Sequence, residues 1–329
     1  MKKEKWLLII LPGIILCLIV NSGAVSRGVA ESLTLCGRVL LPSLYPFCLI
    51  GCLLTEPGML QAVSKKLRIW FLFFLSNCSG YPIGAAMLNR CVRFGKLTEE
   101  EANRLLPCFT APGPGFTISY IGIGLFSSRK MGVLLFLGQF FAGLSLFLLR
   151  RGYRSVIQDT NGKSEFSFVR SVNRAGQSMI TIFFYVLLSG ILNAMLCVYL
   201  SEMPRKLSVL LIEVTTAVSC FGNLYLDNLA LSFAGFCIHL QILSLCDGFR
   251  VRYSSFLLFR LLHAVLSTTY LFFLLRIFSV ELPVFAGSKG VTVTTTNGIA
   301  CAVTLVFSAF VMICSLTQKN SSNFGKNLL

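Results

Sequence analysis

Long apolar runs separated by short polar or basic segments dominate the chain. Runs of this kind predict helices that cross ~30 Å of hydrocarbon. Two further regions, 69–126 and 207–245, are apolar but interrupted, the first at NCSGYP and APGPG and the second by scattered polar residues. The pattern predicts an all-α polytopic membrane protein. The clear spans lie at about 6–20, 40–55, 131–149, 178–200, 255–278 and 299–316.

Basic residues at the edges of these runs set the direction of the chain, because Lys and Arg concentrate in cytoplasmic loops. They all fall on one side if 69–100 and 207–224 are re-entrant hairpins, each followed by a broken helix. Each half then contains a helix, a re-entrant hairpin, a broken helix and a helix, in opposite orientation. Two inverted-topology repeats with broken helices are typical of secondary transporters. The basic clusters lie at 2–5, 65–68, 90–96, 150–176 and 250–252.

The same pattern predicts five parts of the chain. The stretch after the first apolar run contains small residues that resemble a signal cleavage site, but the many later spans favour an uncleaved first helix. The parts are an N-terminal transmembrane helix with an interfacial segment (1–37), a first transport repeat or gate domain (38–150), a basic cytoplasmic loop (151–177), a second, inverted repeat (178–280), and an outer loop, last transmembrane helix and C-terminal tail (281–329).

Composition excludes several functional classes. Only 13% of the residues are charged, against roughly a quarter in soluble domains. The net charge of +16 comes from residues that flank spans, and no basic stripe with interleaved aromatics indicates nucleic-acid binding. The 13 cysteines show no zinc-binding spacing. No nucleotide-binding loop or nucleophile–base pattern appears, so the chain is predicted to be no enzyme and to need no cofactor or metal.

The first interrupted region carries the clearest candidate site. Pro82 cannot donate to a helix ladder, and a helix that begins after Tyr81 points its N-terminus, with free N–H groups, toward the middle of the membrane. Such an end suits an anion. The segment at 112–115, PGPG, cannot stay helical and forms a second break. A proline-kinked span packed through small residues is the alternative. Further along, Thr98 and Glu101 match a capping box for an interfacial helix.

The second interrupted region places Glu213 inside an apolar segment, where an ionisable residue indicates a functional site. Glu213 is expected to bind a coupling proton or cation, or to cap free N–H groups. Asp227 and Asn228 lie near a predicted helix start, which favours capping. His239 is expected to be a hydrogen-bonded core residue, and Gln241 to face another side of the same helix.

From both regions we expect a substrate site without catalytic or metal-binding residues. The candidate substrate-binding residues are Asn77, Ser79, Gly80, Tyr81, Pro82, Gly84, Thr110, Gly113, Pro114, Phe116, Glu213, Thr215, Thr216 and Gln241.

Several motifs together resemble the sporulation integral membrane proteins of the YlbJ type, also called SpoVV. This family shares a nucleoside recognition or gate domain and is similar to concentrative nucleoside carriers. The resemblance covers roughly residues 38–270. Its motifs are LPSLYPF at 41–47, SGYPIGA at 79–85, GKL at 95–97, Glu101-Ala102, Gly113-Pro114-x-Phe116, EVTT at 213–216 and Gly235-x-x-x-x-Leu240-Gln241.

The resemblance implies a multi-pass protein of the cell membrane that moves dipicolinic acid from the mother cell across the outer forespore membrane during sporulation. Its partners would be this small anionic substrate, a coupling ion (proton or sodium) and membrane lipid, with no nucleic acid; an oligomer stays open. Tyr81 or Phe116 would stack on the ring of the substrate. Two alternatives remain: a nucleoside or other small-anion secondary transporter, and a non-transporting sporulation protein whose breaks serve packing.

Overall fold

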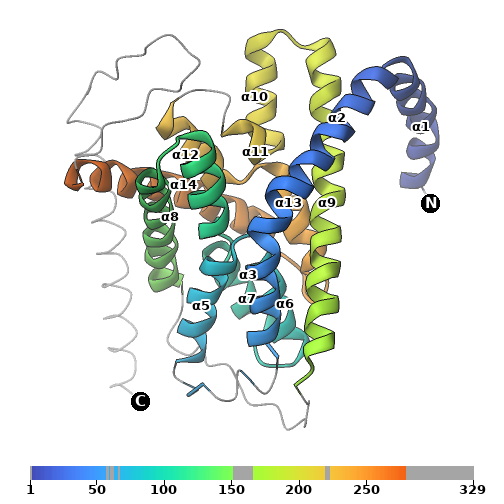
Figure 1. Ribbon diagram of the computed structural model, residues 1–329. Coiled ribbons are helices and arrows are strands. Elements are labelled where there is room, and N and C mark those ends of the chain that lie inside the picture. Colours follow the sequence, from blue (N-terminus) through green and yellow to red (C-terminus); the bar gives the residue numbers. More distant parts are fainter. Residues whose placement is uncertain are drawn as a thin grey trace, which may run out of the picture.

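The computed structural model describes residues 2–56, 59, 63–65, 67–150, 166–218 and 223–278 (Figure 1). The described residues form helices and contain no strand, which confirms the all-α fold. Five helical segments among them are long and apolar enough to cross a membrane. They are Ser22–Leu54, Arg129–Arg150, Phe168–Tyr199, Leu224–Leu245 and Tyr253–Ile277. Residues 151–165, most of the predicted basic cytoplasmic loop, and the predicted last span and tail lie outside the described residues.

The first half of the chain contains two breaks, after Ser79 and after Cys108. Its elements are α1 (Lys2–Val20), α2 (Ser22–Leu35), the π-helix η1 (Cys36–Leu40), α3 (Leu41–Leu54), α5 (Arg68–Ser79), α6 (Ile83–Arg93), α7 (Glu99–Leu105), the 3₁₀-helix η2 (Leu106–Cys108), the π-helix η3 (Gly115–Leu125) and α8 (Arg129–Arg150).

The second half is broken at Glu213 and at Ala234. Its elements are α9 (Phe168–Tyr199), α10 (Glu202–Ile212), α11 (Val214–Ala217), α12 (Leu224–Phe233), α13 (Gly235–Leu245) and α14 (Tyr253–Ile277).

Elements of the same kind follow one another in both halves. Helix α3, the hairpin α5–α6, the broken helix α7–η2–η3 and helix α8 correspond to α9, α10–α11, α12–α13 and α14. The corresponding outer helices also pack together, α3 against α9 and α8 against α14. This arrangement is the one expected of two repeats with re-entrant hairpins and broken helices.

Two spans begin earlier than the sequence predicts: α9 begins at Phe168 rather than near residue 178, and the span that contains α3 also begins earlier. Residues 22–37 were expected at the membrane interface, with a span beginning near residue 40, but α2, η1 and α3 form one continuous helix from Ser22 to Leu54. The small residues of α2 explain this, because they allow close packing on α9. A Cβ atom at Gly28 would lie 2.6 Å from the carbonyl oxygen of Gly190. The low hydropathy of α2 therefore reflects its packing against α9 rather than a position at the membrane interface.

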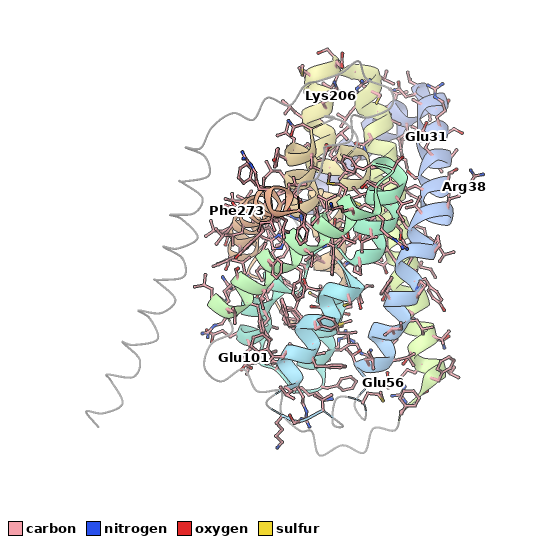
Figure 2. The ribbon with its side chains drawn as sticks, turned by 60° about the vertical axis from the view of Figure 1, so that its left-hand side comes forward. Glu31, Arg38, Glu56, Glu101, Lys206 and Phe273 are labelled. Carbon is pink, nitrogen blue, oxygen red and sulfur yellow. The ribbon has the colours of Figure 1, made fainter. Side chains whose placement is uncertain are left out.

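Several of the basic clusters meet at one end of the molecule, hereafter the basic end. Figure 2 shows Glu56 and Glu101 at this end and Lys206 at the opposite one. The Asn103 side chain donates to the carbonyl of Arg250 at 3.0 Å, which joins α7 to the loop before α14. This convergence agrees with the predicted topology. Other contacts there are Arg90–Glu56, Arg93–Asp247 and Arg150 Nε to the carbonyl of Arg104.

The outer faces of the long helices are apolar and exposed, as in a protein surrounded by lipid. Phe184 of α9 and Leu258 of α14 are 67% and 63% exposed. At the basic end the predicted capping box is confirmed, since Thr98 Oγ1 accepts from the Glu101 amide at 3.2 Å and the Thr98 amide donates to Glu101 Oε2 at 2.9 Å.

Candidate functional site

The two breaks of the first half touch each other. Gly80 adopts φ 76°, a conformation that glycine alone adopts without strain. A Cβ atom there would lie 2.6 Å from the amide nitrogen of Gly113. The Tyr81 amide donates to the carbonyl of Ala111 at 2.9 Å. The tip of the hairpin α5–α6 is thereby fixed against the irregular segment that precedes η3.

The second half repeats this contact. Gly235, with φ 63°, packs on the end of α10, because a Cβ atom there would lie 3.0 Å from the carbonyl oxygen of Ile212. Glu213 then accepts a hydrogen bond from the Thr215 amide at 2.7 Å. Its carboxylate therefore satisfies an N–H group at the start of α11, the capping role proposed from the sequence.

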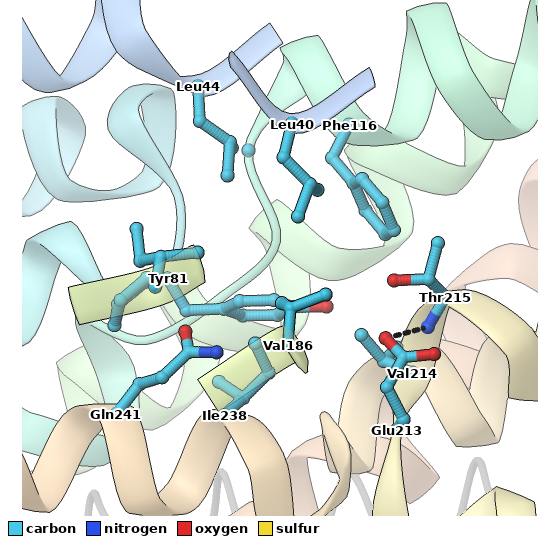
Figure 3. A pocket seen from close by; sticks show the side chains of 13 residues that line it. Leu40, Leu44, Tyr81, Phe116, Val186, Glu213, Val214, Thr215, Ile238 and Gln241 are labelled. Carbon is cyan, nitrogen blue, oxygen red and sulfur yellow. Dashed lines mark hydrogen bonds between the residues drawn. The ribbon is translucent and has the colours of Figure 1, made fainter. Parts of the chain in front are cut away.

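A cavity of about 20 Å³ lies where the breaks of both halves come together (Figure 3). Figure 3 shows the ring of Tyr81 extending between the apolar side chains of Leu40 and Ile238, with its hydroxyl directed toward Thr215. A space this small holds about one water molecule, so the described conformation is closed around the site. Its lining residues are Leu40, Leu44, Tyr81, Pro82, Gly113, Phe116, Ile182, Val186, Glu213, Val214, Thr215, Ile238 and Gln241.

Many candidate residues from the sequence line this cavity, although they come from four different elements. Sequence position alone could not show that these elements meet. The candidates that line the cavity are Tyr81, Pro82, Gly113, Phe116, Glu213, Thr215 and Gln241.

Other candidate residues lie near the breaks but do not line the cavity. Their polar groups serve the backbone: Ser79 donates to the carbonyl of Phe47 at 3.3 Å, and Thr110 to that of Leu106 at 2.9 Å. Gly84 lies against the carbonyl of Phe109. The side chain of Thr216 lies outside the described residues. The candidates that do not line the cavity are Asn77, Ser79, Gly80, Gly84, Thr110 and Pro114.

Two helices begin at the cavity, so that their N-terminal ends lie beside it. The N-terminal ends of α6 and η3, at Pro82 and at Gly113–Phe116, face the cavity. Such ends carry partial positive charge. Both π-helices also contribute to the lining, through Leu40 of η1 and Phe116 of η3. π-Helical segments are frequent at functional sites.

Arg260 of α14 binds the opposite helix ends. It is fully buried, and its Nη1 donates to the carbonyl of Thr110 at 2.7 Å while its Nη2 donates to that of Ser232. The Thr110 carbonyl lies in the irregular segment between η2 and η3, and the Ser232 carbonyl lies in the last turn of α12. A cation at helix C-terminal ends is electrostatically favourable. One arginine therefore connects both broken helices.

The end of α12 links Arg260 to the cavity. The carbonyl of Leu231 accepts from the hydroxyl of Tyr81 at 3.4 Å, and the next carbonyl, Ser232, accepts from Arg260. His239 confirms its expected role as a hydrogen-bonded core residue, with Nε2 2.9 Å from the carbonyl of Phe233. Arg260 was missed by the sequence reasoning, although an arginine inside the run 253–277 carries the same signal as Glu213.

A buried polar network joins α8, α12 and α14. Gln139 donates to Asn228 Oδ1 at 2.8 Å and to Ser232 Oγ at 2.7 Å, and Asn228 donates to Ser267 Oγ at 3.2 Å. The expected capping role of Asn228 is wrong. Asn223 caps α12 instead, accepting from the Tyr225 amide at 3.0 Å, because Asn228 lies one full turn past the helix start at Leu224.

Within the described ranges, no three His, Cys, Asp or Glu side chains lie close enough together to hold a metal ion.

The fold and the cavity define a polytopic α-helical integral membrane protein with a small site between two halves. The chain is similar to the sporulation integral membrane protein YlbJ of Bacillus subtilis (strain 168), with 21% identity over 72% of this chain and 74% of that protein. No protein-family model matches the chain. No solved structure matches it either.

Proposed function

We propose that this chain is a sporulation membrane transporter that carries dipicolinic acid, a small aromatic dianion, from the mother cell across the outer forespore membrane. The similarity to a sporulation integral membrane protein supports the setting. The proposal assigns transport rather than catalysis to the site. A proton or sodium gradient is the proposed driving force, and downhill flux is the other possibility.

One observation carries the proposal: the breaks of both halves meet at one cavity. Non-helical backbone inside a membrane is tolerated only where protein covers it or where it lines a cavity. Transporter sites are built from such discontinuous helices at the interface between repeats. Residues at three of the four breaks line this cavity, at Tyr81–Pro82, at Gly113 and at Glu213–Val214, and a break that served packing alone would not need to lie there.

The chemistry of the lining favours a flat anion. The N-terminal ends of α6 and η3 offer partial positive charge, and the rings of Tyr81 and Phe116 offer flat apolar surfaces. A planar ring with two carboxylates matches both features. Because the cavity has room for about one water molecule, the two halves have to separate for such a substrate to enter.

Sporulating cells that lack this chain test the proposal. Transport of dipicolinate predicts that the compound accumulates in the mother cell and is depleted in spores whose assembly has otherwise proceeded. If spore assembly stops before dipicolinate is made, the chain is a non-transporting assembly protein. If dipicolinate reaches the spores at normal levels, this chain does not carry dipicolinate.

Tyr81→Phe is expected to weaken substrate binding without unfolding the protein. The change removes one hydroxyl from the cavity and keeps the ring. A hydrogen bond from this hydroxyl to the substrate would contribute about 0.5–1.5 kcal/mol, so its loss is expected to raise the KM for dipicolinate uptake by about 2- to 10-fold. Tyr45→Phe, in α3 and outside the cavity lining, is the matched control. An unchanged KM in Tyr81→Phe, or an equal rise in both variants, would contradict the assignment of the cavity.

A further inference from the structure

A second group of charges lies at the basic end, away from the cavity. Glu56 follows α3 and is 0% exposed. Its Oε1 accepts from Arg90 Nη2 at 2.7 Å and from Arg174 Nη1 at 2.9 Å. Arg170 Nη1 lies 3.7 Å from Oε2. We call Arg90, Arg170 and Arg174 the arginine cluster.

The arginine cluster is held in place before any ligand arrives. Arg90 Nη1 donates to the hydroxyl of Thr55 at 2.7 Å and to the carbonyl of Cys52 at 3.1 Å. Arg90 belongs to the hairpin helix α6, whereas Arg170 and Arg174 belong to α9 of the second half. The cluster therefore bridges a hairpin of one half and a helix of the other.

The geometry is that of a carboxylate site. Guanidinium groups bind carboxylates through paired N–H donors, more strongly than neutral donors do. Arg90 and Arg174 both donate to the same oxygen of Glu56. Two guanidinium groups carry two positive charges, and the Glu56 carboxylate carries one negative charge. The side chain of Arg174 is 33% exposed and that of Arg90 is 13% exposed, so the cluster can be reached from the basic end.

We propose that the arginine cluster is a binding site for small carboxylate anions at the basic end, and that Glu56 occupies it in the closed conformation. An arriving carboxylate takes the place of the Glu56 carboxylate on Arg90 and Arg174. The further claim that a dicarboxylate substrate binds this cluster before it reaches the cavity rests on the proposed function.

Helix α6 connects this site to the cavity. It carries Arg90 near one end and begins after Pro82, which lines the cavity, at the other. Its 11 residues span ~16 Å at ~1.5 Å per residue. Release of Glu56 from Arg90 thus removes one of the contacts that hold the helix whose N-terminal end lies at the cavity, while the bonds from Arg90 to Thr55 and Cys52 remain.

If the arginine cluster binds carboxylates, two variants are expected to change the dissociation constant for dipicolinate in opposite directions. Glu56→Gln removes the internal occupant and is expected to lower the dissociation constant for dipicolinate several-fold. Arg174→Gln removes a donor and is expected to raise it several-fold, with Arg174→Lys in between because lysine lacks the paired donors. The exposed pair Arg104–Glu100 at the same end supplies the matched control, Glu100→Gln, with no change expected.

Binding is measured on the purified full chain in detergent, as the shift of the thermal unfolding midpoint over a dipicolinate concentration series. This measurement does not require transport, so it separates failure of the site from failure of the proposed function. The proposal is overturned if Glu56→Gln and Arg174→Gln shift the dissociation constant in the same direction, or if neither shifts it. If Glu56→Gln does not fold, wild type, Arg174→Lys and Arg174→Gln must still rank in that order.

A lipid phosphate could occupy the same cluster, and a second arm of the experiment distinguishes it. The series is repeated after reconstitution with phosphatidylcholine alone and with added phosphatidylglycerol. The same ranking of variants in both lipids supports a small soluble anion. A ranking that appears only with phosphatidylglycerol means that a lipid headgroup is the occupant, and the proposal then fails.

Discussion

Arg260→Met is expected to lower the stability of the folded chain by about 2–6 kcal/mol and to abolish transport. The substitution leaves the carbonyls of Thr110 and Ser232 without their donor, and each unsatisfied buried acceptor costs about 1–3 kcal/mol. The hydrocarbon core holds no bulk water that could replace the arginine as a donor. Because the two carbonyls belong to different halves, the loss also separates the two broken helices. Thermal unfolding in detergent measures the first effect and vesicle uptake the second.

Two variants on the same helix make this prediction specific. Arg260→Lys keeps the charge but not the paired donors, so intermediate stability is expected. Arg276→Met changes an exposed arginine that lies over the ring of Phe272, and an effect of at most about 0.5 kcal/mol is expected there. If Arg260→Met unfolds at the same temperature as Arg276→Met, Arg260 does not hold the broken helices together.

Gly84→Ala is expected to destabilise the protein by about 3 kcal/mol, the upper end of the range for an overfilled core. A Cβ atom at Gly84 would lie 1.7 Å from the carbonyl oxygen of Phe109. Backbone atoms rather than a movable side chain cause this clash, so α6 has to shift away from the segment before η3. Reduced amounts of folded protein in the membrane and a lower unfolding midpoint are the expected observations.

Gly176→Ala is the matched control, because this glycine also lies within a helix, α9, and a Cβ atom there meets nothing within 4 Å. Alanine favours helix over glycine, so the control is expected to be neutral or slightly stabilising. Equal stability of the two variants would show that α6 and the segment at Phe109 are not in close contact.

The sequence predicted the fold class because long apolar runs have few physical explanations. The breaks were predictable from the same letters, since Pro82 and the Pro-Gly pairs at 112–115 disfavour a continuous helix; the second break ends at Gly113, because Pro114 and Gly115 already belong to the start of the following helix. The helix from Ser22 to Leu54 was not, because the polar residues in its first part lower the hydropathy that marks a span. Small residues there pack on α9, a tertiary contact that no local pattern reveals.

The site was predicted where local chemistry marked it. Tyr81, Gly113 and Glu213 stand out as a polar ring, a glycine and an acid inside apolar runs, and all of them line the cavity. Ile182 and Val186 could not be selected, because they resemble every other apolar residue of α9. They line the cavity only because α9 packs against α3 and α13.

Glu56 and Asn228 show a different limit. Glu56 follows an apolar run near several polar residues, and its burial arises from arginines that lie far away in sequence. Asn228 was assigned a capping role near the helix start, but it lies in the second turn after the start at Leu224, which places it inside the membrane-spanning network. A difference of one turn along a helix therefore changes the role of a polar residue from a cap to a buried contact.

Uptake of labelled dipicolinate into vesicles that contain the purified chain is the most direct test of the transport assignment. The expected result is saturable uptake above that of protein-free vesicles, with a raised KM in Tyr81→Phe and dependence on an applied proton or sodium gradient if the flux is coupled. Wild type and the control variant Arg276→Met must both be folded. If their uptake does not exceed the protein-free background, the assignment of the cavity to dipicolinate transport is contradicted.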